Sequence, residues 1–255
     1  MTILLFKILT TPTLILVATL VSRRFGQTTA GWLVGLPLTS GPIAVFLALE
    51  HGPEFARSAA DGSLAGTVGE AFFAVVYASL ARRYGWPACL AGASIAFAVS
   101  GLVLTGFGLS TPVLFVAACG SLVVGLGLIG EPPPHSAPSA ATKWDLPMRM
   151  LLATGLVLLV TSSASFIGAD LSGLAAAFPL YATVLGIFAH RQQGLAAAQG
   201  VMRGLLFGLF GFAGFFAAVS MLVVRIGLLG TFCTALAATA LIQGATFVAL
   251  RRQAN

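Results

Sequence analysis

The sequence predicts an all-α polytopic membrane protein with about nine transmembrane helices arranged as two repeats. Three observations predict this class: a mean hydropathy of +1.01, a charged fraction of only 8%, and apolar runs along nearly all 255 residues. Water-soluble domains carry about 25% charged residues, so a soluble fold is excluded. The apolar runs lack the alternation typical of a transmembrane β-barrel, so helices are expected.

Nine apolar spans are expected, each close to the length that crosses a bilayer. They cover about residues 3–22, 30–49, 64–81, 88–107, 111–130, 148–168, 172–190, 205–224 and 228–250. The first span has no small-residue cleavage site, so it is expected to remain as a mature helix. The longest connection, EPPPHSAPSAATKWD at residues 131–145, is expected to be a semi-rigid cytoplasmic linker because of its prolines. It separates a first half, residues 1–130, from a second half, residues 146–255.

Basic residues divide unevenly between the two faces that nine spans create. One face receives ten of the 13 Lys and Arg residues: Arg23, Arg24, Arg82, Arg83, Lys143, Arg149, Arg191, Arg203, Arg251 and Arg252. The other face receives only Lys7, Arg57 and Arg225. Because cytoplasmic loops are rich in Lys and Arg, the N-terminus is expected outside and the C-terminus inside, in a cell inner membrane. No basic face or aromatic-basic motif accompanies these residues, so nucleic acid is not expected as a partner.

An internal repeat is found when the chain is shifted by 142 residues. Residues 31–98 then lie over residues 173–240 without a gap, and 18 of the 68 aligned positions are identical. Roughly six identities would be expected by chance in this composition, so the repeat is interpreted as real. The aligned positions include two glycine series, Gly62, Gly66 and Gly69 with Gly204, Gly208 and Gly211. Small residues at this spacing share a helix face, and they predict tight packing of the two spans, against each other or against other helices.

The two copies are expected to have opposite orientations, because five spans separate their starting points. This plan, with a five-span half, a four-span half and interrupted helices, resembles that of inverted-repeat secondary transporters. It is similar to the bile-acid/sodium symporter type and, less closely, to the drug/metabolite transporter type. The resemblance covers the plan of the chain and includes no family-specific motif. It implies a central site that opens alternately to the two sides of the membrane.

The second span is interrupted near its middle by GLPLTSGP, residues 35–42. The two prolines remove amide donors and predict helix breaks at Pro37/Pro42, and the repeat predicts another at Pro179. Broken backbone is tolerated at membrane depth only inside protein or beside a wet cavity, where it forms substrate sites in many transporters. The candidate substrate-binding residues are Pro37, Thr39, Ser40, Gly41, Pro42, Pro179, Tyr181 and Thr183. A proline kink that only shapes packing is the alternative.

Glu70 is the one carboxylate well inside a predicted span, six residues after its start at 64. An intramembrane carboxylate predicts a cation ligand or a proton carrier, and the alternative is a place at the outer interface. Asp170 is a second candidate for ion or proton coupling, although a helix N-cap is the competing interpretation. The charged segment 50–62 is expected to be a short re-entrant or interfacial turn, or the wall of an external vestibule.

Enzyme signatures are missing from the sequence. It has no His-Glu-x-x-His zinc helix, no Gly-x-Ser-x-Gly elbow and no phosphate-binding loop, so no catalytic residue, metal or cofactor is expected. The leading hypothesis is a small inner-membrane permease that moves a small solute by alternating access, with H⁺ or Na⁺ as candidate coupling ions and a homodimer as a candidate assembly. The alternatives are a lipid flippase or scramblase that opens beside the fifth span, and a non-transporting membrane subunit.

Overall fold

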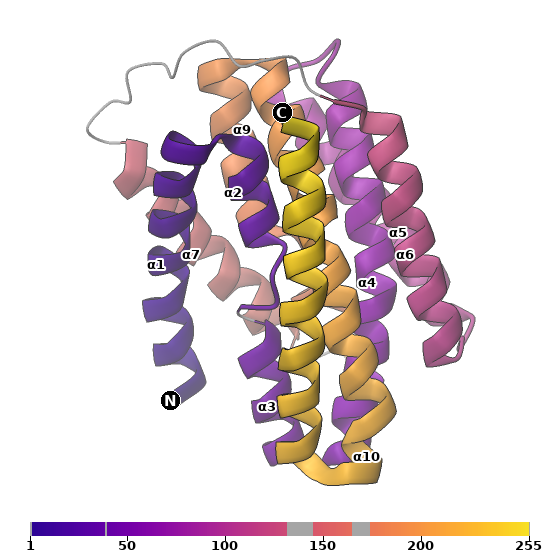
Figure 1. The fold of residues 1–255 in the computed structure, drawn as a ribbon. Coiled ribbons are helices and arrows are strands. Elements are labelled where there is room, and N and C mark those ends of the chain that lie inside the picture. Colours follow the sequence, from indigo (N-terminus) through magenta and orange to yellow (C-terminus); the bar gives the residue numbers. More distant parts are fainter. Residues whose placement is uncertain (1, 39, 132–144, 165–173, 255) are drawn as a thin grey trace.

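The computed structural model describes residues 2–38, 40–131, 145–164 and 174–254, and these residues form helices and no strand (Figure 1). Side chains are described for residues 9–38, 40–131, 146–155 and 174–252. The helices are α1 (Thr2–Phe25), α2 (Gln27–Val34), α3 (Ser40–His51), α4 (Pro53–Leu80), α5 (Trp86–Gly106), α6 (Thr111–Ile129), α7 (Asp145–Ala164), α9 (Leu180–Gln193) and α10 (Leu195–Ala254). The predicted all-α class is therefore confirmed for the described part of the chain.

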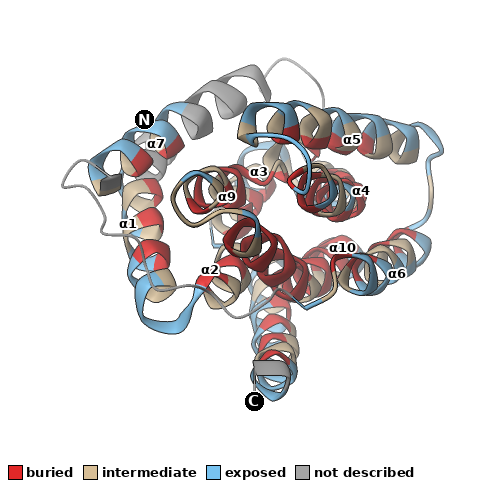
Figure 2. Ribbon diagram, turned by 90° about the horizontal axis from the view of Figure 1, so that it is seen from above, coloured by how far each residue is buried: buried red, intermediate tan, exposed pale blue. Residues whose placement is uncertain are grey.

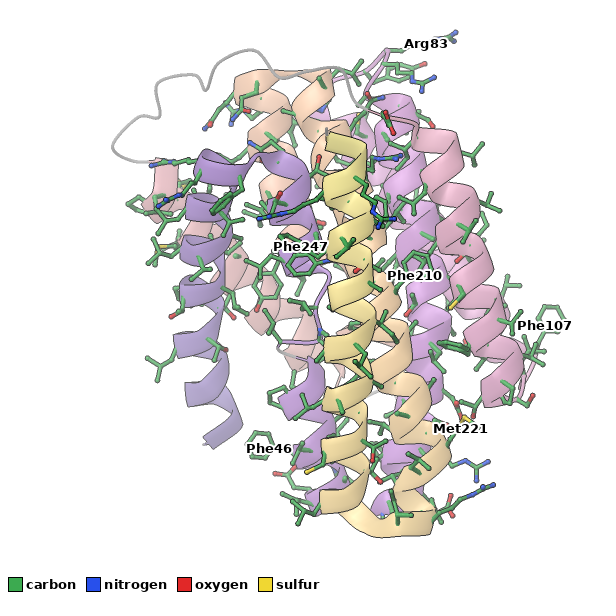
Figure 3. All side chains as sticks on the ribbon, viewed as in Figure 1. Phe46, Arg83, Phe107, Phe210, Met221 and Phe247 are labelled. Atoms are coloured by element: carbon green, nitrogen blue, oxygen red, sulfur yellow. The ribbon has the colours of Figure 1, made fainter. Side chains whose placement is uncertain are left out.

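Several helices are compatible with a membrane. Five helices are long and apolar enough to cross a bilayer: Pro53–Leu80, Trp86–Gly106, Thr111–Ile129, Leu174–Gln193 and Leu195–Arg252. Large apolar side chains such as Ile95, Val116 and Leu128 are exposed on the outer faces of α5 and α6, as expected for helices that contact lipid. Figure 3 shows Phe107 projecting outward from the end of this pair.

The buried residues concentrate on the central helices α4, α9 and the first part of α10 (Figure 2). Seen from above, α5 and α6 lie on one side of this centre and α1 and α7 on the other. The C-terminal part of α10 extends outside the ring of helices. It nevertheless contacts α2, because the indole amine of Trp32 donates a hydrogen bond to Thr246 Oγ1 at 3.1 Å and its ring packs on Phe247.

The helices run between two ends that differ in charge. Figure 1 shows α3 and the first part of α10 running toward the lower end, and α4 and α9 running toward the upper end. Arginines lie in the last turns of α1, α9 and α10, all at the upper end, and Arg83 is there as well (Figure 3). The two basic residues described near the lower end are Arg57 and Arg225. The uneven distribution expected from the sequence is therefore present among the described residues.

Two glycines with positive φ set the starts of the central helices. Gly52 has φ 88° and precedes Pro53, the first residue of α4, while Gly194 has φ 82° and precedes Leu195, the first residue of α10. Glycine adopts this conformation without strain, and proline is favoured at the first helical position. The helices therefore begin about three turns before the predicted membrane spans, whose starts were placed at 64 and 205. The charged segment 50–62 is not a turn, since most of it forms the first turns of α4.

Other predicted boundaries also need correction. Pro42 is not part of a helix break, because it lies in the first turn of α3. Amide groups in a first turn have no intrahelical acceptor, so a proline there removes no helical hydrogen bond. The predicted spans 205–224 and 228–250 are two arms of α10, and they meet at Gly227, whose φ of 73° and ψ of 177° are not helical. Most of the predicted linker, together with Thr39 and Asp170, lies outside the described residues.

The glycine series do produce close helix packing, but with partners other than each other. A Cβ atom on Gly204 would meet the backbone carbonyl of Thr28, and one on Gly208 would meet that of Trp32. The first arm of α10 therefore packs against α2 at backbone distance. In the first copy, a Cβ atom on Gly66 would meet Ala177, close to the second predicted break.

Both ends of α6 are held by charged side chains from the central helices. At its start, the hydroxyls of Thr111 and Ser220 each donate to Asp61 Oδ1 at 2.8 Å. At its end, Arg203 Nη1 donates to the carbonyls of Leu126 at 3.0 Å and Gly130 at 2.6 Å. A negative charge at a helix N-terminus and a positive charge at its C-terminus are both favourable. These contacts fix α6 between α4 and α10.

Candidate functional site

The first helix break is centred on Pro37, between α2 and α3. The amide of Leu38 donates to the carbonyl of Leu36 at 2.8 Å, which is the two-residue spacing of a γ-turn. The helix resumes when the amide of Gly41 donates to the carbonyl of Pro37 at 2.9 Å. Because proline has no amide hydrogen, the helical ladder cannot continue through this point. The break predicted at Pro37 is therefore confirmed.

The second break is centred on Pro179 and has the same hydrogen bonds. The amide of Leu180 donates to Phe178 at 2.7 Å, and the amide of Thr183 donates to Pro179 at 2.8 Å. Pro179 has φ −76° and ψ 60°, the geometry of an inverse γ-turn. Each of these bonds lies 142 residues after its counterpart in the first break. The break predicted at Pro179 is also confirmed.

The two breaks meet at a small cavity in the interior of the bundle. The Ser40 hydroxyl is 3.5 Å from the carbonyl of Ala176, which has lost its helical partner because the Leu180 amide turns to Phe178. The cavity has a volume of about 50 Å³. Its walls come from both breaks and from two central helices: Val34, Gly35, Leu36, Ser40, Ile43, Glu70, Ala175, Ala176, Ala177, Phe178, Pro179, Leu180, Tyr181, Ala182, Leu205, Leu209 and Phe212. Such a volume holds a few water molecules or one small ion.

Glu70 is the charged group of this cavity. It lies 17 residues after Pro53 in α4, about 26 Å along the helix, and only 4% of its surface is exposed. Glu70 is therefore buried inside the bundle, far from the start of α4. Among the described residues, none donates a hydrogen bond to its carboxyl group or forms an ion pair with it. A buried carboxyl group without a partner either binds a proton or needs a cation from outside the chain.

The structure brings only part of the predicted substrate site together. Ser40, Pro179 and Tyr181 line the cavity with Glu70. Pro37 is buried and forms the break without lining the cavity, and Gly41 faces Phe215 of α10. Pro42 and Thr183 also lie outside the lining.

Tyr181 connects the cavity with the side of the bundle that α1 covers. Its hydroxyl lies 3.2 Å from Thr11 Oγ1 of α1, so a hydrogen bond joins the second break to the first helix. A crevice of about 10 Å³ lies beside it, lined by Leu14, Leu33, Val34, Leu36, Leu38 and Tyr181. Val34, Leu36 and Tyr181 line both the crevice and the central cavity, so these three residues separate the two spaces.

A larger hollow of about 440 Å³ lies near the lower end of the bundle. Arg57, Asp61 and Arg225 line it with the start of α6, and Arg57 also lies 3.8 Å from Glu54. Arg57 and Asp61 of the charged segment for which a vestibule wall is one expectation both line this hollow. Its Asp61 already accepts two hydrogen bonds, so it contributes to packing of α6 more than to ligand binding.

Several residues of the central site were not expected from the sequence. Leu205, Leu209 and Phe212 of α10 form one wall of the cavity, and Phe212 is the residue aligned with Glu70 by the repeat. Among sequence features, only this alignment could have placed Phe212 in the site. Glu70 and Phe212 occupy equivalent positions of two central helices, and both line the cavity. No group of three His, Cys, Asp or Glu side chains that could hold a metal ion occurs within the described ranges. No protein family, curated protein or solved structure matches the chain.

Proposed function

We propose that the protein is a small inner-membrane secondary transporter that moves a small solute by alternating access. The observation that carries this proposal is the meeting of two identical helix breaks at a cavity containing an unpaired carboxyl group. Broken helices near the midplane provide the binding site in many transporters, because their free carbonyls and helix ends can coordinate a substrate or an ion. The N-terminus is outside and the C-terminus cytoplasmic in this proposal, because the basic residues gather at the upper end.

The proposal includes two inverted halves and nine passages through the membrane. The passages are α1, α2 with α3, α4, α5, α6, α7, residues 174–193, and the two arms of α10. The repeat is supported by local structure, since Gly52 and Gly194 share a positive φ and precede equivalent helices. The inversion is supported by direction, because α3 and α9 run oppositely, as do α4 and the first arm of α10 (Figure 1).

Glu70 is the coupling residue in this mechanism. It would bind H⁺ or Na⁺ together with the solute. The change between outward-open and inward-open states buries the site, and burying a neutralised carboxyl group costs far less free energy than burying a charged one. The Ser40 hydroxyl and the carbonyl of Ala176 would contact the solute from the two breaks. Opening of the crevice beside Tyr181 and of the lower hollow would expose this site in turn.

Uptake into proteoliposomes tests the coupling role of Glu70. Amino acids, organic acids, sugars and nucleosides are first screened by thermal shift, and each stabilising compound is then assayed under a proton or a sodium gradient. Glu70→Gln should reduce gradient-driven uptake about a hundredfold or more, because it removes the titrating group but keeps its size. Glu50→Gln, at an exposed position near the end of α3, is the matched control and should be neutral. Gradient-driven uptake that persists in Glu70→Gln would contradict the coupling role.

A double variant tests the first helix break. Pro37→Ala with Ser40→Ala restores an amide hydrogen at the break and removes the hydroxyl that reaches the second break. We expect loss of uptake with the folded state retained, measured by size-exclusion chromatography and circular dichroism. Pro12→Ala, within α1, is the control for removing a proline from a helix in this chain. Unchanged uptake in the double variant would refute the substrate site.

Lipid scrambling is the second candidate function, and the crevice beside Tyr181 favours it. Leu38 at the edge of this crevice is 39% exposed, so lipid chains could approach the first break directly. An opening beside α6 is disfavoured by the contacts of Asp61 and Arg203 at the two ends of that helix. Fluorescent-lipid exchange in the same vesicles distinguishes the two functions. Rapid exchange without solute uptake would favour scrambling, and neither activity would favour a non-transporting subunit.

A further inference from the structure

Three buried polar atoms without partners lie on the facing sides of α4 and α9, above the central cavity. They are the Tyr77 hydroxyl, Thr183 Oγ1 and His190 Nδ1, and none has a hydrogen-bond partner among the described residues. Tyr77 is 0% exposed and Thr183 is 2% exposed. Native structures leave few buried polar groups unpaired, so three in one region indicate bridging water or a functional requirement.

These groups are ordered along two helices that run in the same direction. Glu70 and Tyr77 are seven residues apart on α4, and Thr183 and His190 are seven residues apart on α9, so each pair shares a helix face. Seven residues correspond to about 10 Å along a helix. The lower members lie at or next to the cavity, and the upper members lie near the basic end of the bundle (Figure 1).

Direct ring contacts connect the two helices at the upper level. The rings of Tyr77 and His190 are 6.0 Å apart at 68°. The hydroxyl-bearing carbon of Tyr77 lies 4.0 Å from the position of a Cβ atom on Gly186. Gly186 is on the same face of α9 as Thr183 and His190, and the methyl group of Met202 lies nearest to its Cβ position, with the Tyr77 ring beside it. The Tyr77 hydroxyl therefore lies between the levels of Thr183 and His190.

We propose that Thr183, Tyr77 and His190 form a proton path between Glu70 and the upper end of the bundle, with water molecules bridging the gaps. Each hydroxyl accepts one proton and releases another, and the imidazole does the same through its two nitrogens, so no group changes its net protonation after a transfer. The inference rests on the proposed coupling role of Glu70. It extends that role by assigning the side of the membrane with which Glu70 exchanges its proton.

Other titratable and charged groups around the path are few. The Cys89 thiol of α5 faces Tyr77, and it donates to the carbonyl of Tyr84 at 3.5 Å. From α7, Arg149 donates to Gln192 Oε1 at 3.0 Å, close to His190 at the end of α9. From α10, the neutral Gln199 donates to the carbonyl of Ala78. Arg149 therefore places a positive charge near the upper opening of the path.

Time-resolved infrared spectroscopy tests the path without knowledge of the solute. The chain has only seven Asp and Glu residues, so the carboxyl band of Glu70 can be assigned as the band that disappears in Glu70→Gln. Proteoliposomes with the basic end outward are enriched by capture on a C-terminal tag, and protons are released outside from a caged donor. We expect Tyr77→Phe and Thr183→Val to slow protonation of Glu70 about tenfold or more.

Tyr84→Phe is the matched control, because Tyr84 is 55% exposed after the end of α4 and should not affect the rate. The Tyr77→Phe variant keeps the ring that packs on His190, and circular dichroism melting verifies that the variant remains folded. An unchanged protonation rate in Tyr77→Phe would overturn the path while the coupling role of Glu70 survives. If no carboxyl band is lost in Glu70→Gln across the titration, both the path and the coupling role are wrong.

Discussion

Gly204→Ala should destabilise the folded protein by about 3 kcal/mol, the upper end of the range for an overpacked core. The added methyl group would collide with the backbone carbonyl of Thr28, and the amide nitrogen of Trp32 would lie only 2.7 Å away. Backbone atoms cannot rotate aside as a side chain can, so α2 must separate from α10. We expect this loss even though alanine is the better helix former by about 1 kcal/mol.

Thermal or denaturant unfolding in detergent measures the effect, with Gly244→Ala as the matched control. Gly244 lies in the second arm of the same helix, and no atom is within 4 Å of its Cβ position. The control should therefore be neutral or slightly stabilising. Equal stability of the two variants would show that α2 and α10 are not in backbone contact in the membrane protein.

Arg203→Met should also destabilise the protein by about 3 kcal/mol, because it removes the side-chain donor to the Gly130 carbonyl and leaves the Leu126 carbonyl with the Gly130 amide alone. Arg203 is only 6% exposed and donates to Leu126 and Gly130, while its second nitrogen lies 4.0 Å from Glu131. Methionine preserves the apolar length of the side chain, so the loss reports the guanidinium group. The same measurement on Asp61→Asn should give a smaller loss, about 1 kcal/mol, since asparagine can still accept a hydrogen bond.

Hydrogen–deuterium exchange locates these effects. The last turn of α6 should exchange faster in Arg203→Met, and its first turn should exchange faster in Asp61→Asn. Arg252→Met, at an exposed position near the C-terminus, is the control and should alter neither turn. Uniform exchange changes across the protein would contradict a local role at the ends of α6.

The helix breaks could be predicted from the sequence because a proline acts locally. Pro37 and Pro179 each remove an amide hydrogen from a helix, and they align with each other when the sequence is shifted by 142 residues. Pro42 was misassigned because the same local rule has an exception in the first turn, and the sequence does not show where α3 begins. The part of the cavity wall that α10 forms could not be predicted, because the spacing of residues within one helix does not show which other helix it packs against.

The starts of α4 and α10 could not be predicted from hydropathy. Hydropathy identifies segments apolar enough to contact lipid, and it does not identify helical segments that contact protein. Residues 53–63 include Glu54, Arg57 and Asp61, which are too polar for a lipid-facing span. In the structure this part of α4 contacts protein, and Ala56, Ala59 and Ala60 are buried there. Charged residues in the first three turns are then compatible with a continuous helix, since Glu54 pairs with Arg57 and Asp61 accepts hydrogen bonds from Thr111 and Ser220.

The two charged residues at the ends of α6 have a consequence for the history of the chain. Asp61 and Arg203 occupy equivalent positions of the proposed repeat, yet they have opposite signs. A single helix lying between two inverted copies offers amide hydrogens to one copy and carbonyl oxygens to the other. Identical residues inherited from an ancestral duplication could not satisfy both. In the proposed inverted repeat, the unpaired fifth helix therefore requires the two copies to differ at this position, and a return to identical residues would be electrostatically unfavourable.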